Sequence, residues 1–243
     1  MNTIVIILLL MTSFVHAQNF REGQLQFTRV RNAYAEKEAA IKVLLQQQGA
    51  AAPFELFIRA FKKEQRVEVW VRGKGKSVFS LVVSYPFCST SGTLGPKRKE
   101  GDLQIPEGVY HINHFNPLSN FHLSLGINYP NASDKVWADK NAPGGSIYLH
   151  GNCVTIGCIP LTDDKIKELY LLAVEARANG QQKIPVHIFP ARLDNGVPEQ
   201  LAALQPAHLT FWKNLQTIYA QFEKEQVLKP VRITKDGWYR LSD

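Results

Sequence analysis

Short apolar segments with strand periodicity fill the middle of this chain, and they constrain its fold more than any other feature. Residues 67–71 alternate in character, Gly73 to Gly75 forms a turn, and residues 78–83 form a second apolar run. The pattern therefore predicts a β-rich central region. Further short strands, separated by Gly, Pro, Asn and Asp, are predicted at 108–112, 121–125, 146–150 and 186–189.

Both ends of the chain show helix periodicity. Residues 20–48 carry apolar side chains at helical spacing among charged ones, and Gly49 and Pro53 end this segment. A late helix is predicted from about 207 to 228, and a short terminal hairpin is expected within residues 231–241.

One more helix is expected inside the central region. It begins near Thr162, where Asp163 and Asp164 favour its positive end, and it stops at Gly180. The connection of residues 128–145 has no clear periodicity, and loops of that length are often functional.

The net charge and the placement of basic residues indicate which partners to expect. The chain has 243 residues, which suits one or two domains, and 28 Lys and Arg against 21 Asp and Glu give a net charge of +7. Such an excess favours acidic partners. No dense basic run with interleaved aromatic residues occurs, so no nucleic acid is expected as a partner.

The first 17 residues resemble an export signal. Ile4 to Met11 is an unbroken apolar run, and Val15 to Ala17 is a small-residue cleavage site. The run is shorter than the roughly 20 residues that span a bilayer, so no stable membrane span is expected. An uncleaved anchor is the alternative, because Met1 to Thr3 contains no Lys or Arg.

The chain has three cysteines, Cys88, Cys153 and Cys158, so a free thiol is a candidate for catalysis. Paired thiols become disulfides outside the cytoplasm, and an odd count leaves at least one over.

The densest chemical cluster, residues 149–158, pairs Cys158 with His150. A thiol attacks a carbonyl only as thiolate, and a free pKa of about 8.5 leaves little thiolate at neutral pH. An imidazole can take that proton and later return it to a leaving amine. The sequence therefore proposes Cys158 as nucleophile and His150 as its base.

The chain must fold back for the two side chains to meet. Eight extended positions span roughly 26 Å. Gly151 and Gly157 are expected to allow the bend through positive φ, and the amides of Gly157 and Cys158 could form an oxyanion hole.

Other interpretations of the cluster stay open at this point. His150 could be a core histidine, and Cys153 and Cys158 could be buried hydrophobes or a disulfide. His150, Cys153 and Cys158 could also bind zinc, but no fourth ligand with suitable spacing is evident, so we expect no metal and no cofactor.

The cluster resembles the L,D-transpeptidase catalytic domain (YkuD-like), and within it the YafK-like branch. The family signature is a His-Gly followed by Ser/Thr-His-Gly-Cys. Here His150-Gly151 matches the first part and Thr155-Ile156-Gly157-Cys158 the second. The resemblance covers roughly residues 55 to 192, through ordered matches that include 57–64, 85–88, 106–110, 129–131 and 186–190.

This resemblance implies an α+β fold: a β-rich catalytic domain with a mixed sheet as sandwich or barrel, flanked by helices at both ends. Four parts are expected, namely a signal peptide at 1–17, an N-terminal helical segment at 18–54, the catalytic domain at 55–192 and a C-terminal helical extension with a hairpin at 193–243.

The resemblance also implies an exported enzyme of the periplasm or cell envelope, with a role in cell wall biogenesis and cell shape. The cysteine would attack a peptidoglycan stem peptide and form an acyl-enzyme, which a second amine resolves into a cross-link or a protein attachment. An amidase that uses water instead is one alternative, and a non-catalytic wall-binding module is another. The implied partners are stem peptides and a wall-attached protein.

Family positions assign further candidate residues. Gly157, Thr155 and Gly151 shape the loop, and His122 is a candidate substrate-side residue. Cys88 is interpreted as structural, and the role of Cys153 stays open.

Two positions depart from the common pattern. Ile156 replaces the signature His, and Pro160 replaces an Arg that could bind a substrate carboxylate. Lys97 or Arg98 is the cation expected to take over that task.

Overall fold

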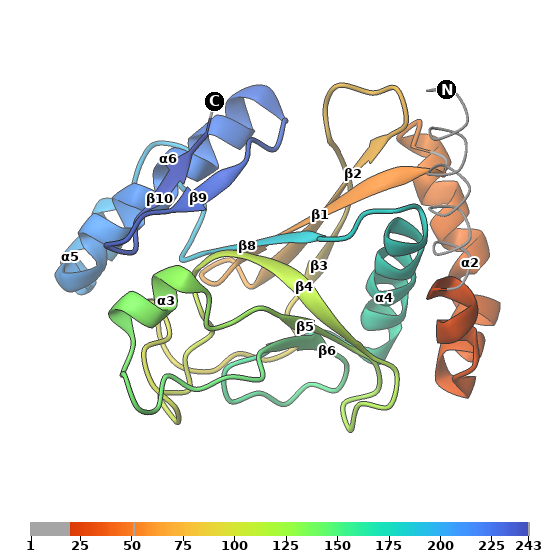
Figure 1. Ribbon diagram of the computed structural model, residues 1–243, viewed down its shortest axis with the longest axis horizontal. Coiled ribbons are helices and arrows are strands. Elements are labelled where there is room, and N and C mark those ends of the chain that lie inside the picture. Colours follow the sequence, from red (N-terminus) through yellow and green to blue (C-terminus); the bar gives the residue numbers. More distant parts are fainter. Residues whose placement is uncertain (1–19, 51, 243) are drawn as a thin grey trace, which may run out of the picture.

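The computed structural model describes residues 20–50 and 52–242, and the predicted signal peptide at 1–17 lies outside these ranges. Within them the chain forms an eight-stranded mixed sheet, a two-stranded hairpin and surrounding helices (Figure 1). The predicted α+β class is confirmed. Across the described part of the chain, no helix combines the length and apolar character needed to cross a membrane.

The sheet has the strand order β3-β2-β1-β8-β4-β5-β6-β7. Pairs β1–β8 and β6–β7 are parallel, and the other neighbours are antiparallel. Its strands are β1 (Phe54–Phe61), β2 (Arg66–Gly73), β3 (Ser80–Pro86), β4 (Gly108–Asn116), β5 (Ser124–Ile127), β6 (Tyr148–His150), β7 (Ile159–Pro160) and β8 (Pro185–Phe189).

The helices lie on both sides of this sheet. Figure 1 shows α2 outside α4 at one end of the molecule, and α6 with the β9–β10 hairpin at the other. The remaining elements are α2 (Thr28–Gln47), α3 (Ala132–Trp137), α4 (Asp163–Ala178), α5 (Glu199–Leu204), the 3-10 turn η1 (Pro206–His208), α6 (Leu209–Glu225), β9 (Val231–Ile233) and β10 (Tyr239–Leu241).

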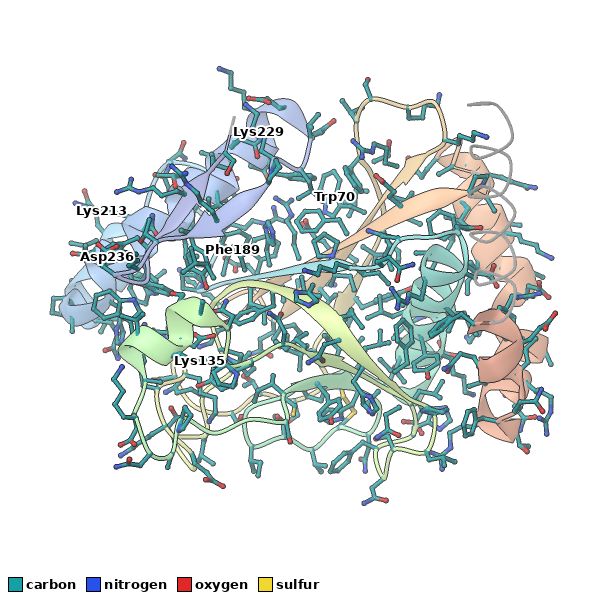
Figure 2. The ribbon with its side chains drawn as sticks, viewed as in Figure 1. Trp70, Lys135, Phe189, Lys213, Lys229 and Asp236 are labelled. Carbon is teal, nitrogen blue, oxygen red and sulfur yellow. A yellow bond between two sulfur atoms is a disulfide. The ribbon has the colours of Figure 1, made fainter. Side chains whose placement is uncertain are left out.

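Strand β1 explains why the sheet needs cover on both faces. Successive strand residues point to opposite faces. Leu56 and Ile58 belong to the core shared with α2 and α4, whereas Phe57 packs with Phe222 of α6 and Phe61 with Tyr219. A strand buried on both faces has a nearly continuous apolar sequence, as residues 54–61 do. Figure 2 shows Trp70 and Phe189 between α6 and the sheet.

The predicted helix after the cysteine cluster is confirmed. Thr162 caps α4 by accepting a hydrogen bond from the Lys165 amide, and Asp163 and Asp164 lie in the first turn. Gly180 has a φ of +100° just beyond the helix. The helical segment predicted at 20–48 is present but is broken at residues 26–27, just before α2, and the terminal hairpin is confirmed as the antiparallel pair β9–β10.

Two predictions about the central region were wrong in part. The strand expected at 121–125 begins only at Ser124, because the backbone turns at His122 with a φ of +66°. The connection 128–145 contains α3, where the Asn131 side chain accepts from the Asp134 amide and the Asp134 side chain accepts from the Asn131 amide. This reciprocal capping stabilises a helix too short to show periodicity.

A buried arginine joins the sheet to α6. Arg59 on β1 is 1% exposed and pairs with Glu68 at 2.7 Å and with Glu223 of α6 at 2.5 Å. Its guanidinium lies 4.8 Å from the centre of the Trp70 ring. Arg192 forms a further ion pair with Glu68. The charges are therefore compensated where water is excluded.

We predict that Arg59→Met destabilises the fold by about 3–5 kcal/mol, because it leaves Glu68 in a buried position without its main partner. Urea denaturation followed by tryptophan fluorescence measures this loss. The control is Arg72→Met, which removes a half-exposed pair with Glu55 and should cost at most about 1 kcal/mol. Equal losses in the two variants would contradict the role given to Arg59.

Candidate active site

The pairing of β6 with β7 places the predicted nucleophile next to the strand that carries the predicted base. Leu149 pairs with Ile159 and His150 with Pro160 in a parallel register. Cys158, just before β7, therefore lies opposite Tyr148, whose amide donates to its Sγ at 3.4 Å. Tyr148 and His150 are two residues apart and face the same side of the strand.

A disulfide fixes the loop between the two strands. Cys153 is bonded to Cys88, with a Cα–Cα distance of 5.2 Å, and Cys158 is free. The Cys88 amide also donates to Pro160 O at 3.1 Å, so the segment that carries Cys88 lies against β7. The structural interpretation of Cys88 is confirmed. The alternatives that paired Cys153 with Cys158, or placed both on zinc with His150, are wrong, because Cys153 is already bonded.

The two loop glycines have different tasks. Gly157 has a φ of +137°, as expected. Gly151 does not take a positive φ, and the left-handed position falls on Asn152, at +62°. Gly151 is needed for space instead: a Cβ there would lie 2.5 Å from Asp163 Oδ1 and 2.9 Å from His122 Cβ.

The Thr155 hydroxyl organises the backbone around the thiol. Its Oγ1 accepts from the Cys158 amide at 2.9 Å and from the Gly157 amide at 3.2 Å, and it donates to Cys158 O at 2.8 Å. The two amides expected to form an oxyanion hole thus converge on one oxygen. In this structure that oxygen belongs to Thr155, so a substrate oxyanion would have to replace it.

His150 is 2% exposed and tied to the backbone. Its Nδ1 lies 2.5 Å from Gly151 O. Because a carbonyl oxygen only accepts, Nδ1 carries the proton and Nε2 is the basic nitrogen. The Phe121 ring covers the imidazole, with centroids 4.8 Å apart. Burial lowers the pKa of His150 below its usual 6.5, and the bond to Gly151 opposes this shift.

Cys158 Sγ contacts two backbone groups, because it accepts from the Tyr148 amide and donates to Ser146 O at 3.7 Å. Burial raises the pKa of the Cys158 thiol above its ordinary value, while the Tyr148 amide and the charge of Lys97 oppose this shift. At neutral pH both groups are therefore uncharged, and the thiol needs a base at the moment of attack.

Both side chains line one cavity of about 520 Å³, to which we refer as the thiol cavity. Its mouth carries exposed apolar side chains, with Ile156 79% and Val154 51% exposed. Among the described residues, no hydrogen bond joins His150 to Cys158. The lining comprises Asn116, Ser119, Asn120, Phe121, Ser124, Ser146, Tyr148, His150, Val154, Thr155, Ile156 and Cys158.

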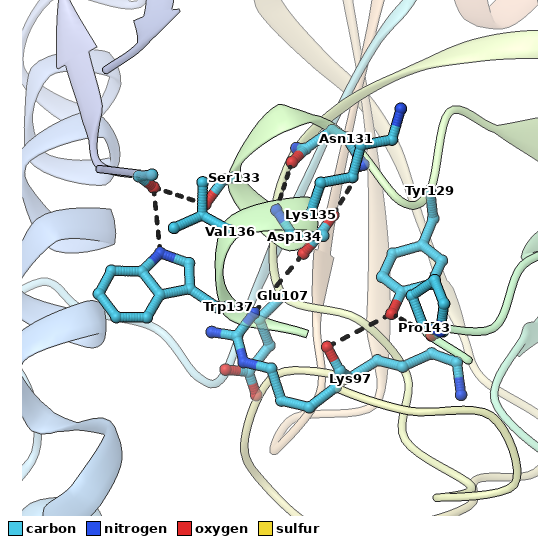
Figure 3. Close-up of polar contacts among 12 residues, drawn as sticks. Lys97, Glu107, Tyr129, Asn131, Ser133, Asp134, Lys135, Val136, Trp137 and Pro143 are labelled. Atoms are coloured by element: carbon cyan, nitrogen blue, oxygen red, sulfur yellow. Dashed lines mark hydrogen bonds and ion pairs between the residues drawn. The ribbon is translucent and has the colours of Figure 1, made fainter. Parts of the chain in front are cut away.

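The other candidate residues lie elsewhere. His122 lines a neighbouring cavity with Asp163, and burial lowers its pKa. Lys97 is 4% exposed, and its Nζ donates to Asp102 at 2.6 Å. Arg98 lies 3.8 Å from Asp134 of α3. Figure 3 shows Lys97 near Tyr129 in this region. Neither cation lines the thiol cavity, so the structure does not bring them to the position expected of a carboxylate-binding residue.

Sequence reasoning missed Phe121 and Tyr148 as site residues. Tyr148 precedes His150 by two positions on a predicted strand, so alternation could have placed it on the same face. Phe121 was expected within a strand, and no local pattern links it to His150.

Comparisons with known proteins agree with this architecture. The profile of the YkuD family, described as the L,D-transpeptidase catalytic domain, matches residues 55–188. The chain is 32% identical over 190 residues to the candidate L,D-transpeptidase YafK of Escherichia coli K12, covering 77% of this chain and 74% of that protein.

Two solved structures are similar at low identity. Pgp2, the helical cell shape determining protein of Campylobacter jejuni, is 17% identical with a TM-score of 0.46, over 76% of this chain and 74% of Pgp2. L,D-transpeptidase 1 of Mycobacterium tuberculosis is 16% identical with a TM-score of 0.32, over 56% of this chain and 62% of its own.

Fold and site together define a β-rich domain that holds one free cysteine and one buried histidine in a common cavity. The chain belongs to the L,D-transpeptidase catalytic domain family, since the family profile covers more than half of it. The resemblance to the YafK-like branch is likewise confirmed.

We predict that iodoacetamide alkylates only Cys158 in the native protein without reductant, and that its rate keeps rising above pH 9. The reason is that burial raises the pKa of this thiol. Rates between pH 5 and 10, read by mass spectrometry of peptides, give the profile. A rate that is constant from pH 6 upward would indicate a thiolate–imidazolium pair and contradict the neutral resting state.

A second prediction concerns the disulfide. Removing it in the Cys88→Ala/Cys153→Ala double variant should cost roughly 4 kcal/mol, because the bond spans 65 residues of the unfolded chain. Urea denaturation measures the loss, and Cys158→Ala is the matched control, for which most of the stability should remain. Stability that is unchanged in the double variant would show that the loop holds its shape without the bond.

Proposed function

We propose that the protein is a peptidoglycan acyltransferase, an L,D-transpeptidase of the periplasm or cell envelope that acts through Cys158. One observation carries the proposal: the single free thiol of the chain and a buried imidazole with a fixed tautomer line the same cavity. Membership of the L,D-transpeptidase family supports stem peptides as the substrate class.

The first half of the reaction forms a thioester. Cys158 Sγ attacks the carbonyl carbon of the stem peptide while its proton passes to His150 Nε2. The Gly151 carbonyl stabilises the imidazolium that forms, because it accepts from Nδ1. The oxyanion replaces Thr155 Oγ1 as the acceptor of the Gly157 and Cys158 amides. The C–N bond then breaks, and His150 returns its proton to the departing amine.

The second half transfers the acyl group. An acceptor amine attacks the thioester, His150 takes its proton, and the thiol is regenerated. An acceptor on another stem peptide gives a cross-link, and one on a protein gives an attachment to the wall. Water in place of the amine gives hydrolysis, so the products distinguish a transpeptidase from an amidase.

We predict that the wild-type protein forms an acyl-enzyme with a purified stem tetrapeptide, and that intact-protein mass spectrometry locates it on Cys158. Cys158→Ala should abolish the adduct, and His150→Gln should slow its formation by about 10²–10⁴-fold, the usual contribution of a general base. His111→Gln, a half-buried histidine outside the thiol cavity, is the control and should react normally.

The products then decide between the two outcomes of the acyl-enzyme. Incubation with defined muropeptides should yield species whose mass corresponds to two joined peptides. Muropeptides that only lose the mass of a peptide, with no joined species, would show that the protein is a hydrolase and not a transpeptidase. Unaltered muropeptides together with an unmodified Cys158 would leave wall binding as the function.

A further inference from the structure

A second cavity lies directly beside the thiol cavity. It measures about 660 Å³, and we refer to it as the polar cavity. Asn120 lines both cavities, and the loop after β6 contributes Val154 to the thiol cavity and Asn152 to the polar one. The lining of the polar cavity comprises Arg29, Asn120, His122, Asn152, Cys153, Thr162, Asp163 and Asp164.

The thiol cavity contains no Lys, Arg, Asp or Glu in its lining. A stem peptide carries free carboxylates and amines, so its charged groups need partners outside that cavity. The position at which the family often has an arginine is Pro160 here. The polar cavity is the neighbouring place where charged side chains are available.

Arg29 of α2 offers one open edge to this cavity. Its Nη1 donates to Ser119 O at 2.6 Å and also to His122 O. Its Nε and Nη2 form no hydrogen bond with any described residue, and neither atom is buried. The guanidinium is therefore held in place while the Nε–Nη2 edge is accessible. That edge can donate two parallel hydrogen bonds to a carboxylate.

Asp163 supplies the opposite charge. Its Oδ1 accepts from the Asn152 amide at 2.8 Å, and its Oδ2 has only the Nδ1 of His122 at 4.0 Å. The side chain is 56% exposed, so Oδ2 can accept from an ammonium group. The neighbouring Asp164 is already engaged by Lys37 and Lys165.

Backbone strain also concentrates here. His122 and Asn152 have φ values of +66° and +62°, and both line the polar cavity. Such positions cost energy and persist where the surrounding structure enforces them, often at ligand sites. Arg29 bonds the carbonyl of His122, and Asp163 bonds the amide of Asn152, so the two charged residues themselves hold the strained backbone.

We propose that the polar cavity binds a substrate group that carries both a carboxylate and an ammonium, with Arg29 as partner of the carboxylate and Asp163 as partner of the ammonium. This inference rests on the proposed function, because the group belongs to the stem peptide whose carbonyl Cys158 attacks. It assigns a substrate-binding residue to α2, which precedes the family-matched region 55–188.

Calorimetric titration of the full chain carrying Cys158→Ala tests the proposal without turnover. The probes are three tetrapeptides that differ only in the third residue: 2,6-diaminopimelic acid, its side-chain monoamide, and lysine. All three keep the ammonium, and only the first has the carboxylate beside it. We expect the diaminopimelate peptide to bind about tenfold more tightly than the other two, as one charge-assisted contact allows.

Two variants in the Cys158→Ala background separate the two charges. Arg29→Gln should remove the tenfold advantage of the diaminopimelate peptide and leave the lysine peptide within about twofold of its original affinity. Asp163→Asn, which keeps Oδ1 as an acceptor, should weaken all three peptides. Arg31→Gln is the matched control, because the hydrogen bonds of Arg31 within the described part of the chain go to Leu25, Gln26 and Thr28 and not to the polar cavity.

The outcomes are distinct. Equal weakening of all three peptides by Arg29→Gln would reduce Arg29 to a loop-positioning residue and overturn the proposal. Equal affinities of the three peptides for the Cys158→Ala protein would overturn it as well. Discrimination that the Cys158→Ala protein shows and that Arg29→Gln removes, together with no acyl-enzyme on wild-type Cys158, would leave the binding site valid and the proposed chemistry wrong.

Discussion

The parallel pairing of β6 with β7 is the contact on which the site depends. It returns the chain after an eight-residue excursion, so that Cys158 lies beside Tyr148 and in the cavity of His150. A two-residue strand at the edge of a sheet has few hydrogen bonds of its own to hold it. The disulfide from Cys153 to Cys88 and the three hydrogen bonds of the Thr155 hydroxyl supply the missing constraint. The geometry of the thiol is thus fixed by covalent and side-chain contacts more than by the strand.

The segments outside the family-matched region cover the apolar surfaces that this region leaves open. Helix α4 covers one face of β1 and α6 the other, and α2 packs on the outside of α4, so a domain of residues 55–188 alone would expose an apolar surface of α4 and another on the sheet toward α6. Arg59 pairs with Glu68 and Glu223 at the boundary with α6, where a charge needs a partner because water is excluded. On the other side, Arg29 of α2 bonds the backbone that carries Phe121, and Phe121 covers His150. The N-terminal helix therefore contacts the wall of the thiol cavity and does more than cover the core.

The elements that the sequence predicted well are those whose signal is local. Helix α4 has a cap, acidic residues in its first turn and a terminal glycine, and each acts within a few residues of its end. Strand β7 was missed because two residues, one of them Pro160, show no periodicity and pair only through tertiary contacts. The partner of Cys153 could not be deduced, since three cysteines allow three pairings and the choice depends on the position of a segment 65 residues away. The expectation for Gly151 failed for a similar reason: its constraint comes from Asp163 and His122, which surround it in space.

The disulfide and the burial of Cys158 together determine the chemical state of the three cysteines. The disulfide uses two of them, and burial raises the pKa of the third, Cys158, which keeps it protonated. Thiolates are the species that oxidants attack, so a neutral Cys158 is less prone to oxidation in an oxidising compartment. Burial also lowers the pKa of His150, so transfer of the thiol proton to His150 is unfavourable in the resting protein. In the reaction that we propose, transfer becomes favourable only when a carbonyl accepts the electron pair of sulfur and the amides of Gly157 and Cys158 stabilise the oxygen. The exposed apolar side chains of Val154 and Ile156 fit the same proposal, because a substrate bound against them would exclude water from the developing charges.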